Sequence, residues 1–293
     1  MKVTPLDEAE RRPRRVAVGT FDGVHLGHRE VIRGSDTVLT FDPHPQEVVS
    51  PDHMPPKLLA PFEIKRDLIG GLGVEELVVI PFDREFAARG AGEFIDAVLV
   101  ERLGATHVSV GENFRFGHKA GGDAELLQTR TEFETRVVPL VEFGGETISS
   151  SHIRGLIAAG EIARASDFLG GPFLIEGVVV EGDKRGRELG FPTANLVPDD
   201  RLVCPGHGVY AAWAHGHAAA VNVGVRPMFE TGRGLLVEAY LIDFEGDLYG
   251  HTLRIAFAER LRGERRFESV DALVAQMWRD TKRAKEIATV PGP

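Results

Sequence analysis

The stretch that most constrains the fold is VAVGTFDGVHLGHREVI, residues 16–32, in which an apolar run precedes a glycine-containing turn and two histidines. Such an arrangement predicts a buried strand that leads through the turn to the N-terminus of a helix. The backbone N–H groups of turn and helix then point into one small volume, which favours an anion such as phosphate. His25 and His28 can each hydrogen-bond a phosphoryl oxygen and balance the charge that develops during phosphoryl or nucleotidyl transfer. The stretch therefore predicts a nucleotide-handling enzyme.

Length and composition narrow the class of protein. A chain of 293 residues predicts about two domains, and its 43% hydrophobic content provides for a sizeable core. The formal net charge of −10 argues against a nucleic-acid-binding surface, which is normally basic. The single cysteine, Cys204, excludes an internal disulfide and is better interpreted as a packed thiol than as a nucleophile. Without a membrane-length apolar run or a signal-peptide pattern, we predict a cytoplasmic enzyme with no nucleic-acid or membrane partner.

In the first half of the chain, short apolar runs alternate with helical patterns. The predicted strands lie at 14–19, 37–41, 77–80, 107–110 and 136–141, with a helix at 92–103. This alternation predicts an α/β domain with a parallel sheet and right-handed crossovers. Polar clusters follow three of the strands, at 21–28, 42–45 and 111–117. Because ligands bind such sheets beyond the carboxyl ends of the strands, we expect these clusters to form one site.

The third cluster, GENFRFG at residues 111–117, combines an amide with two aromatic rings. Asn113 can hydrogen-bond a ligand, and Phe114 and Phe116 offer flat apolar surface for a ring system. The alternative interpretation is a loop whose two phenylalanines only fill the core. Both interpretations place the segment directly after a predicted strand.

A run of serines, residues 149–151, precedes a predicted helix. One hydroxyl would suffice to cap that helix, so capping alone explains neither the other hydroxyls nor Arg154 one turn later. An arginine beside hydroxyls and free N–H groups is typical of phosphate binding. Ser150, Ser151 and Arg154 therefore predict a second phosphate-binding cluster.

The pattern changes after Gly170-Gly171-Pro172, which is a natural hinge. Five strand-like runs follow, at 173–180, 208–214, 218–223, 235–243 and 253–257, before a helix whose apolar face begins at Val270. Closely spaced strands with glycine turns predict an antiparallel barrel. We therefore predict two domains, 1–169 and 170–293.

The polar residues of the second domain gather in GDKRGRELGFPTAN, residues 182–195. Thr193 and Asn195 lie two residues apart, on the same side of an extended segment, which suits a hard cation such as Mg²⁺ that bridges phosphates. The alternative interpretation is a solvated basic hairpin. The candidate phosphate-binding residues here are Gly182, Lys184, Arg185, Gly186, Arg187, Gly190 and Pro192.

These motifs together resemble one family. HxGH behind FDG, with SSxxIR far downstream, is similar to the nucleotidyltransferase superfamily, in which these segments hold a nucleoside triphosphate. FDPHP and GENFRFG narrow the match, and GxxRGRxLGFPTANL is very similar to the flavokinase signature. Over nearly its whole length the chain resembles the bacterial bifunctional riboflavin kinase/FMN adenylyltransferase (FAD synthetase) family. The resemblance implies a Rossmann-like nucleotidyltransferase domain that adenylylates FMN and a flavokinase barrel that phosphorylates riboflavin, with ATP as co-substrate, Mg²⁺ as cofactor, and FMN and FAD as products.

The resemblance also implies roles for individual residues. Glu238, in LLVEAYLIDFEGDLYG, matches the glutamate that acts as general base toward the ribityl 5′-hydroxyl in flavokinases, whereas a glutamate on a barrel strand is otherwise typically solvated. His25 and His28 would stabilise the triphosphate. The implied ATP-binding set of the adenylyltransferase is Gly19, Phe21, Asp22, Gly23, Gly27, Asn113, Ser150, Ser151 and Arg154.

Two features depart from the family pattern. Only eight residues, REVIRGSD, separate His28 from the strand at Thr37, so we expect a truncated helix or missing residues at a crossover that normally needs about 10–12 residues. Met228 stands where the family usually has threonine. The alternative function is an active riboflavin kinase whose N-terminal half is weakened, only binds flavin or acts on another acceptor.

Overall fold

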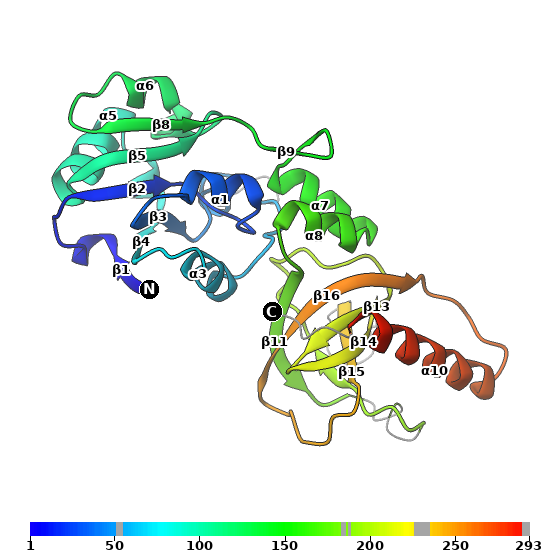
Figure 1. Ribbon diagram of the computed structural model, residues 1–293. Coiled ribbons are helices and arrows are strands. Elements are labelled where there is room, and N and C mark those ends of the chain that lie inside the picture. The colour runs from blue at the N-terminus through cyan, green and yellow to red at the C-terminus, as the bar shows by residue number, and fades with distance from the viewer. Residues whose placement is uncertain (51–54, 183–185, 187–188, 226–234, 289–293) are drawn as a thin grey trace. The chain divides into compact units, whose positions relative to one another are not determined.

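The structure is a computed structural model of the chain. It describes residues 1–50, 55–182, 186, 189–225 and 235–288. The chain forms two compact units, Met1–Ser150 and Ser151–Pro293 (Figure 1). The domain boundary between residues 169 and 170 stays a prediction.

The first unit is built on a six-stranded sheet of order β1-β4-β3-β2-β5-β8, in which every pairing is parallel. The strands are β1 Lys2–Pro5, β2 Arg14–Val18, β3 Thr37–Asp42, β4 Glu76–Pro81, β5 Ala105–Gly111 and β8 Glu134–Val138. This confirms the predicted α/β fold and its five strands. The sixth, β1, was not predicted because Thr4 is its only buried residue, so its four residues carry almost no apolar signal.

Helices cover both faces of this sheet. On one face, Ala17, Val38 and Leu77 pack with α1 (Leu26–Ile32) and α3 (Phe62–Gly70). On the other, Val18, Leu39 and Val78 pack with the π-helix η2 (Phe94–Arg102), so neighbouring residues of each strand serve opposite cores. The short elements are η1 Leu6–Glu8, α2 Pro45–Val49, α4 Arg84–Ala87, α5 Ala91–Glu93, β6 Arg115–Phe116, η3 His118–Ala120, β7 Gly122–Asp123, α6 Ala124–Gln128, β9 Glu142–Phe143 and β10 Glu146–Thr147.

The crossover between β2 and β3 is complete despite its short helix. Helix α1 has seven residues, as the short segment predicts, but it begins at Leu26, before His28. A turn from Gly19 to His25 adds further length, and β2 and β3 pair in parallel with Val16 opposite Thr37. Counted from the end of β2, the connection therefore exceeds the usual minimum of about 10–12 residues. The structure gives no support to a defective first unit.

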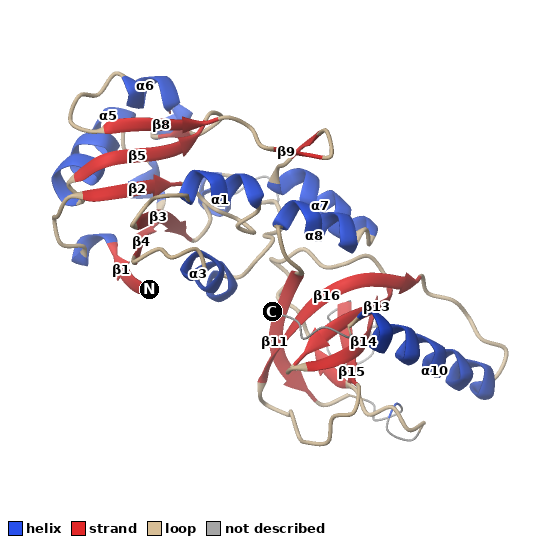
Figure 2. Ribbon diagram, in the orientation of Figure 1, coloured by secondary structure: helices blue, strands red, loops and turns tan. Residues whose placement is uncertain are grey.

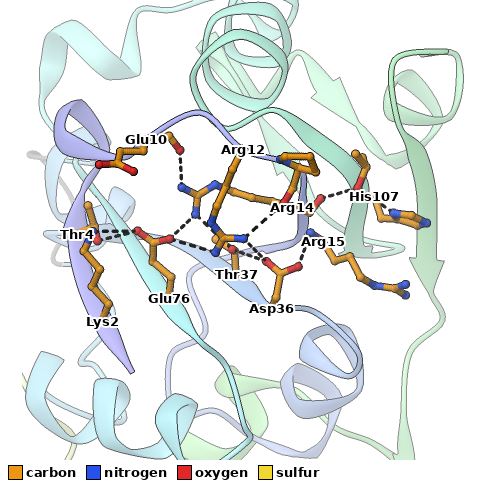
Figure 3. A network of polar contacts seen from close by, with 12 residues as sticks. Lys2, Thr4, Glu10, Arg12, Arg14, Arg15, Asp36, Thr37, Glu76 and His107 are labelled. Carbon is orange, nitrogen blue, oxygen red and sulfur yellow. Dashed lines mark hydrogen bonds and ion pairs between the residues drawn. The ribbon is translucent and has the colours of Figure 1, made fainter.

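The amino ends of the strands are joined by a buried polar network (Figure 3). The Arg14 guanidinium, 1% exposed, forms an ion pair with Glu76. Thr4 Oγ1 donates to Glu76 Oε1 at 2.8 Å, and Arg12 Nη2 lies 3.3 Å from Glu76 Oε2. Burial alone would raise the pKa of the Glu76 carboxyl, but the hydrogen bonds from Arg14 and Thr4 lower it below its ordinary value. The network stabilises the end of the sheet opposite the carboxyl ends.

The second unit is a closed antiparallel barrel of order β11-β12-β15-β14-β13-β16, preceded by two helices and followed by one (Figure 2). Its elements are α7 Ser150–Ala159, α8 Ile162–Leu169, β11 Phe173–Val180, β12 Ala194–Leu196, β13 Gly208–Ala214, β14 His217–Val225, β15 Leu235–Leu241, β16 Thr252–Arg262 and α10 Val270–Ile287. The predicted barrel and its five strands are confirmed, and α10 packs against β13 and β14. None of the described helices combines the length and the apolar character needed to cross a membrane.

Candidate active sites

The first unit contains a cavity of about 920 Å³ at the carboxyl ends of its central strands. Val18 of β2, Phe41 of β3 and Gly111 of β5 all line it. All three predicted polar clusters contribute to its wall. The lining residues from those clusters include Phe21, His25, Gly27, His28, Pro45, Asn113, Phe114 and Phe116.

The two histidines stack on one another at the start of α1. Their ring centroids lie 3.5 Å apart with the planes inclined by 16°, and the ring of Phe21 meets His28 edge-on at 5.5 Å. The backbone N–H of His28 donates to Nδ1 of His25 at 3.3 Å, so His25 caps the helix through its side chain. Because Nδ1 accepts, the ring proton of a neutral His25 lies on Nε2.

His28 is held in the neutral form. Burial lowers the pKa of its imidazole well below the ordinary value, and the neighbouring His25 and Lys65 lower it further. Its Nδ1 is buried and has no hydrogen-bond partner within the described part of the chain. An anion in the cavity would act in the opposite direction and raise this pKa, because a negative charge favours the protonated ring.

Lys65, from α3, is a charged residue beside this site that the sequence did not single out. Its ammonium is buried and lies 3.4 Å from Thr20 O, 3.4 Å from Thr40 Oγ1 and 3.3 Å from Phe41 O. It therefore connects the carboxyl ends of β2 and β3. Burial lowers the pKa of Lys65, while the carboxylates of Asp42, Asp22 and Glu47 act in the opposite direction.

The remaining residues of the predicted first site divide into three groups. Gly19, Asn113 and Ser150 line the cavity. Asp22 and Gly23 belong to the same turn but, among the described residues, are not part of the lining; the Asp22 carboxylate accepts from Leu59 N at 2.8 Å. Ser151 and Arg154 lie on α7 in the second unit, where Arg154 Nη1 donates to Ser151 Oγ at 3.2 Å.

Both phenylalanines of GENFRFG line the cavity, and one of them also fills the core. Phe116 is 7% exposed and belongs to the core around η2, as the alternative interpretation expected. Phe114 stacks on it with ring centroids 5.4 Å apart, and both side chains line the cavity. An aromatic wall therefore stands beside the polar cluster.

The second unit has its own cavity, of about 820 Å³, on the outer side of the barrel wall. Along β15, Val237 and Ala239 are fully buried, whereas Leu236, Glu238 and Tyr240 line the cavity. Leu273, Met277, Asp280 and Thr281 of α10 line it from the other side. Glu238 thus points outward, as a solvated glutamate on a barrel strand would. The terminal helix α10 covers that face, so Glu238 lines a cavity.

Glu238 lies in the middle of a row of polar residues. On the neighbouring strand β12 its register partner is Asn195, and on β14 it is Asn222. Asn222 Nδ2 donates to Glu238 Oε2 at 3.3 Å. All three side chains line the cavity. Asn222 was missed at the sequence level, although it is the only polar residue within the apolar run AVNVGV.

Asn195 lines this cavity and has an unpaired side-chain oxygen. The residue is 5% exposed, and its Oδ1 is buried with no hydrogen-bond partner among the residues that the structure describes. Thr193 lines the same cavity, two residues earlier on the chain. An amide oxygen and a hydroxyl, two residues apart on the chain, are oxygen ligands of the kind that a hard cation such as Mg²⁺ prefers. Within the described ranges, no three His, Cys, Asp or Glu side chains are grouped so that they could hold a metal ion.

The glycine-rich segment is described only in part. Gly186 and Pro192 line the cavity, and Gly190 has a φ of +86°, which favours glycine. Gly182 contacts the side chain of Asn195 so closely that a Cβ added to it would lie 2.3 Å from Asn195 Nδ2. Lys184, Arg185 and Arg187, together with Met228, lie outside the described residues.

A histidine pair at the end of a parallel sheet and a carboxylate–amide row on a barrel define a two-unit, nucleotide-dependent transferase. Family profiles agree: the one for FAD synthetase matches residues 7–152 and the one for riboflavin kinase matches residues 169–288. The chain belongs to the bifunctional riboflavin kinase/FMN adenylyltransferase family.

Individual relatives support this membership. The bifunctional riboflavin kinase/FMN adenylyltransferase of Escherichia coli is 37% identical, covering 98% of this chain and 97% of the relative. The protein of the same name from Listeria monocytogenes is 36% identical over 90% of this chain and 89% of its own. A crystal structure described as a macrolide-efflux protein from Streptococcus pneumoniae has the same fold, with a TM-score of 0.87 and 31% identity, covering 97% of this chain and 99% of that one.

Proposed function

We propose that the two reactions of the family are divided between the two cavities. The barrel transfers the terminal phosphoryl group of ATP to riboflavin, which gives FMN and ADP. The α/β unit transfers AMP from ATP to FMN, which gives FAD and pyrophosphate. The observation that carries this division is that each unit has a cavity of its own, lined by the residues that the two family profiles cover. We place the functional boundary between residues 169 and 170, just before β11.

In the kinase reaction, Glu238 is the general base. An alcohol attacks a phosphoryl group poorly until its proton can leave, and a carboxylate within hydrogen-bond reach accepts that proton. The position of Glu238 on the cavity wall, beside Asn195, supports this role. Thr193 and Asn195 would hold Mg²⁺, which when bound neutralises charge on the ATP phosphates. Gly182 to Arg187, with Gly190 and Pro192, would form the phosphate-binding loop.

In the adenylylation reaction, catalysis rests on positioning and charge stabilisation. His25 Nε2 donates a hydrogen bond to a phosphate oxygen, and His28 becomes protonated as the triphosphate arrives. Gly19, Phe21, Gly27, Asn113 and Ser150 place the nucleotide along the cavity wall. Pyrophosphate binding by Ser151 and Arg154 stays a prediction. Asp22 and Gly23 act by shaping the turn, a role supported by the bond between Asp22 and Leu59. No covalent enzyme intermediate is needed in either reaction.

The experiment that tests this function measures each half-reaction separately on the purified full chain. With riboflavin, ATP and Mg²⁺ we expect FMN and ADP, and with FMN, ATP and Mg²⁺ we expect FAD and pyrophosphate. FMN formation without any FAD from added FMN would contradict the bifunctional proposal and favour the weakened N-terminal half. The cytoplasmic location and the absence of nucleic-acid and membrane partners stay predictions.

A further inference from the structure

The general base of the kinase site has a neighbour to which the proposed mechanism gives no task. Asn222 lies directly opposite Glu238 in the register of β14 and β15, and its side-chain amide donates to Glu238 Oε2 at 3.3 Å. Both neighbours of Asn222 on its strand, Val221 and Val223, are fully buried. The backbone that carries Asn222 is therefore fixed by the barrel core, while its side chain faces the cavity.

We infer that Asn222 is a positioning residue for Glu238: its amide holds Oε2 so that Oε1 faces the ribityl hydroxyl. The inference rests on the proposed role of Glu238 as general base. A carboxylate has two equivalent oxygens and rotates about its last bond, so a base held by nothing samples many unproductive orientations. One donor on one oxygen removes that freedom and leaves the other oxygen available for the proton of the substrate.

The chemistry of an amide suits this task better than a charged donor does. A guanidinium or ammonium group bound to Glu238 would stabilise the anion strongly and make it a poorer proton acceptor. A neutral amide orients the carboxylate while leaving its basicity largely intact. The arginines that line this cavity lie on β16 and in the loop that follows it, and Arg262 is paired with Asp280 at 2.9 Å.

A glycine near Asn222 allows the close approach of an acidic side chain. A Cβ on Gly224, two residues along the same side of β14, would lie 3.7 Å from Asn222 Nδ2 and only 2.7 Å from Glu264 Oε1. Gly224 therefore lets Glu264 approach the row closely. Glu264 also lines the cavity, and the inference predicts that the Asn222 amide stays bound to Glu238 in the catalytic state.

The test replaces Asn222 by aspartate, which has nearly the same shape but, when ionised, cannot donate from that atom and also adds a negative charge beside Glu238. We expect the kinase kcat of Asn222→Asp to fall by roughly 10- to 100-fold, the scale of a misplaced catalytic group, with the KM values for riboflavin and ATP changed less than about 3-fold. FMN adenylylation by the same sample should be unchanged, which controls for folding. Asn222→Ala lacks the donor and adds no charge, so its kcat should fall over the same range; a fall in Asn222→Asp alone would be an effect of the added charge and would overturn the positioning role.

A double-mutant cycle separates this inference from the proposed function. In the Glu238→Gln background, Asn222→Asp should change the residual kinase rate less than about 3-fold, because there is no base left to orient. If Glu238→Gln leaves the kinase active, the proposed function is wrong. If Glu238→Gln is inactive but Asn222→Asp and Asn222→Ala keep wild-type kcat, or alter only KM, the positioning role alone is overturned.

Discussion

Gly182 offers a substitution that should disable one activity of this chain and spare the other. The Cβ of an alanine at this position would lie 2.3 Å from Nδ2, 2.7 Å from Cγ and 2.8 Å from Oδ1 of Asn195. Ordinary van der Waals contact begins at 3.4 Å, so the amide must move by about 1.1 Å. Asn195 is only 5% exposed, so the movement displaces the unpaired oxygen that we assign to Mg²⁺.

A displacement of about 1 Å in a catalytic site costs on the order of 100-fold in rate. We therefore expect Gly182→Ala to lower the kinase kcat/KM by roughly 100-fold, equivalent to about 2.7 kcal/mol of transition-state stabilisation. The assay is initial-rate FMN formation from riboflavin at saturating ATP and Mg²⁺. FAD formation from added FMN should stay at the wild-type rate, because the adenylylation cavity lies in the other unit.

The matched control is Gly155→Ala. Gly155 lies within α7 of the same unit, and a Cβ added there meets no atom within 4 Å. This variant should keep both activities and gain up to about 1 kcal/mol of stability, because alanine is the better helix former. A Gly182→Ala protein with kinase activity within about 3-fold of wild type would refute the proposed role of the Gly182–Asn195 contact.

Two further predictions concern the first unit. Glu76→Gln removes one partner of the buried Arg14–Glu76 pair and should lower the free energy of unfolding of that unit by about 3–5 kcal/mol in thermal or urea melts. The control Glu134→Gln, whose side chain is 80% exposed, should change it by less than about 0.5 kcal/mol. Equal effects would contradict the stabilising role of the network in Figure 3. The lowered pKa of His28 means that the unfolded chain binds its proton first, so the stability of the unit should fall as the pH drops below about 6.5. His28→Asn should flatten this dependence between pH 5 and 7, and an unchanged slope would show that His28 is not held neutral.

The elements that the sequence predicts well are those with a strong apolar signal. β11 and β13 were predicted with the bounds that they have, because each is a largely apolar run of seven or eight residues with a glycine or proline within two residues of each end. β12 and β1 were not predicted, because they have only three and four residues and too few apolar side chains to show the two-residue period of a strand. Their strand character comes from pairing with partners far away in the chain.

The candidate sites could be predicted only as far as they lie in motifs. His25, His28, Thr193 and Asn195 stand in short, dense patterns whose spacing reports a local geometry. Lys65 lies 45 residues from Thr20 in the chain. No local sequence pattern predicts that its ammonium contacts the ends of two strands. Asn222 depends on the register between β14 and β15, which pairs residues 16 positions apart.

The location of the kinase cavity also could not be predicted without the fold. Alternation along β15 predicts that Glu238 shares a face with Leu236 and Tyr240, but it cannot say whether that face looks into the barrel or away from it. The structure places it outside, where α10 covers it. An outward glutamate on a barrel strand therefore keeps a catalytic position because a helix 32 residues downstream completes the cavity.

The most direct test of the division of labour is the pair of half-reactions measured on Glu238→Gln. Glutamine keeps the shape of the side chain but cannot accept the hydroxyl proton, so riboflavin-dependent formation of FMN and ADP should fall by about 10²- to 10⁴-fold. The same protein, supplied with FMN, ATP and Mg²⁺, should form FAD at the wild-type rate. Loss of both activities, or an unimpaired kinase, would contradict the assignment of one reaction to each cavity.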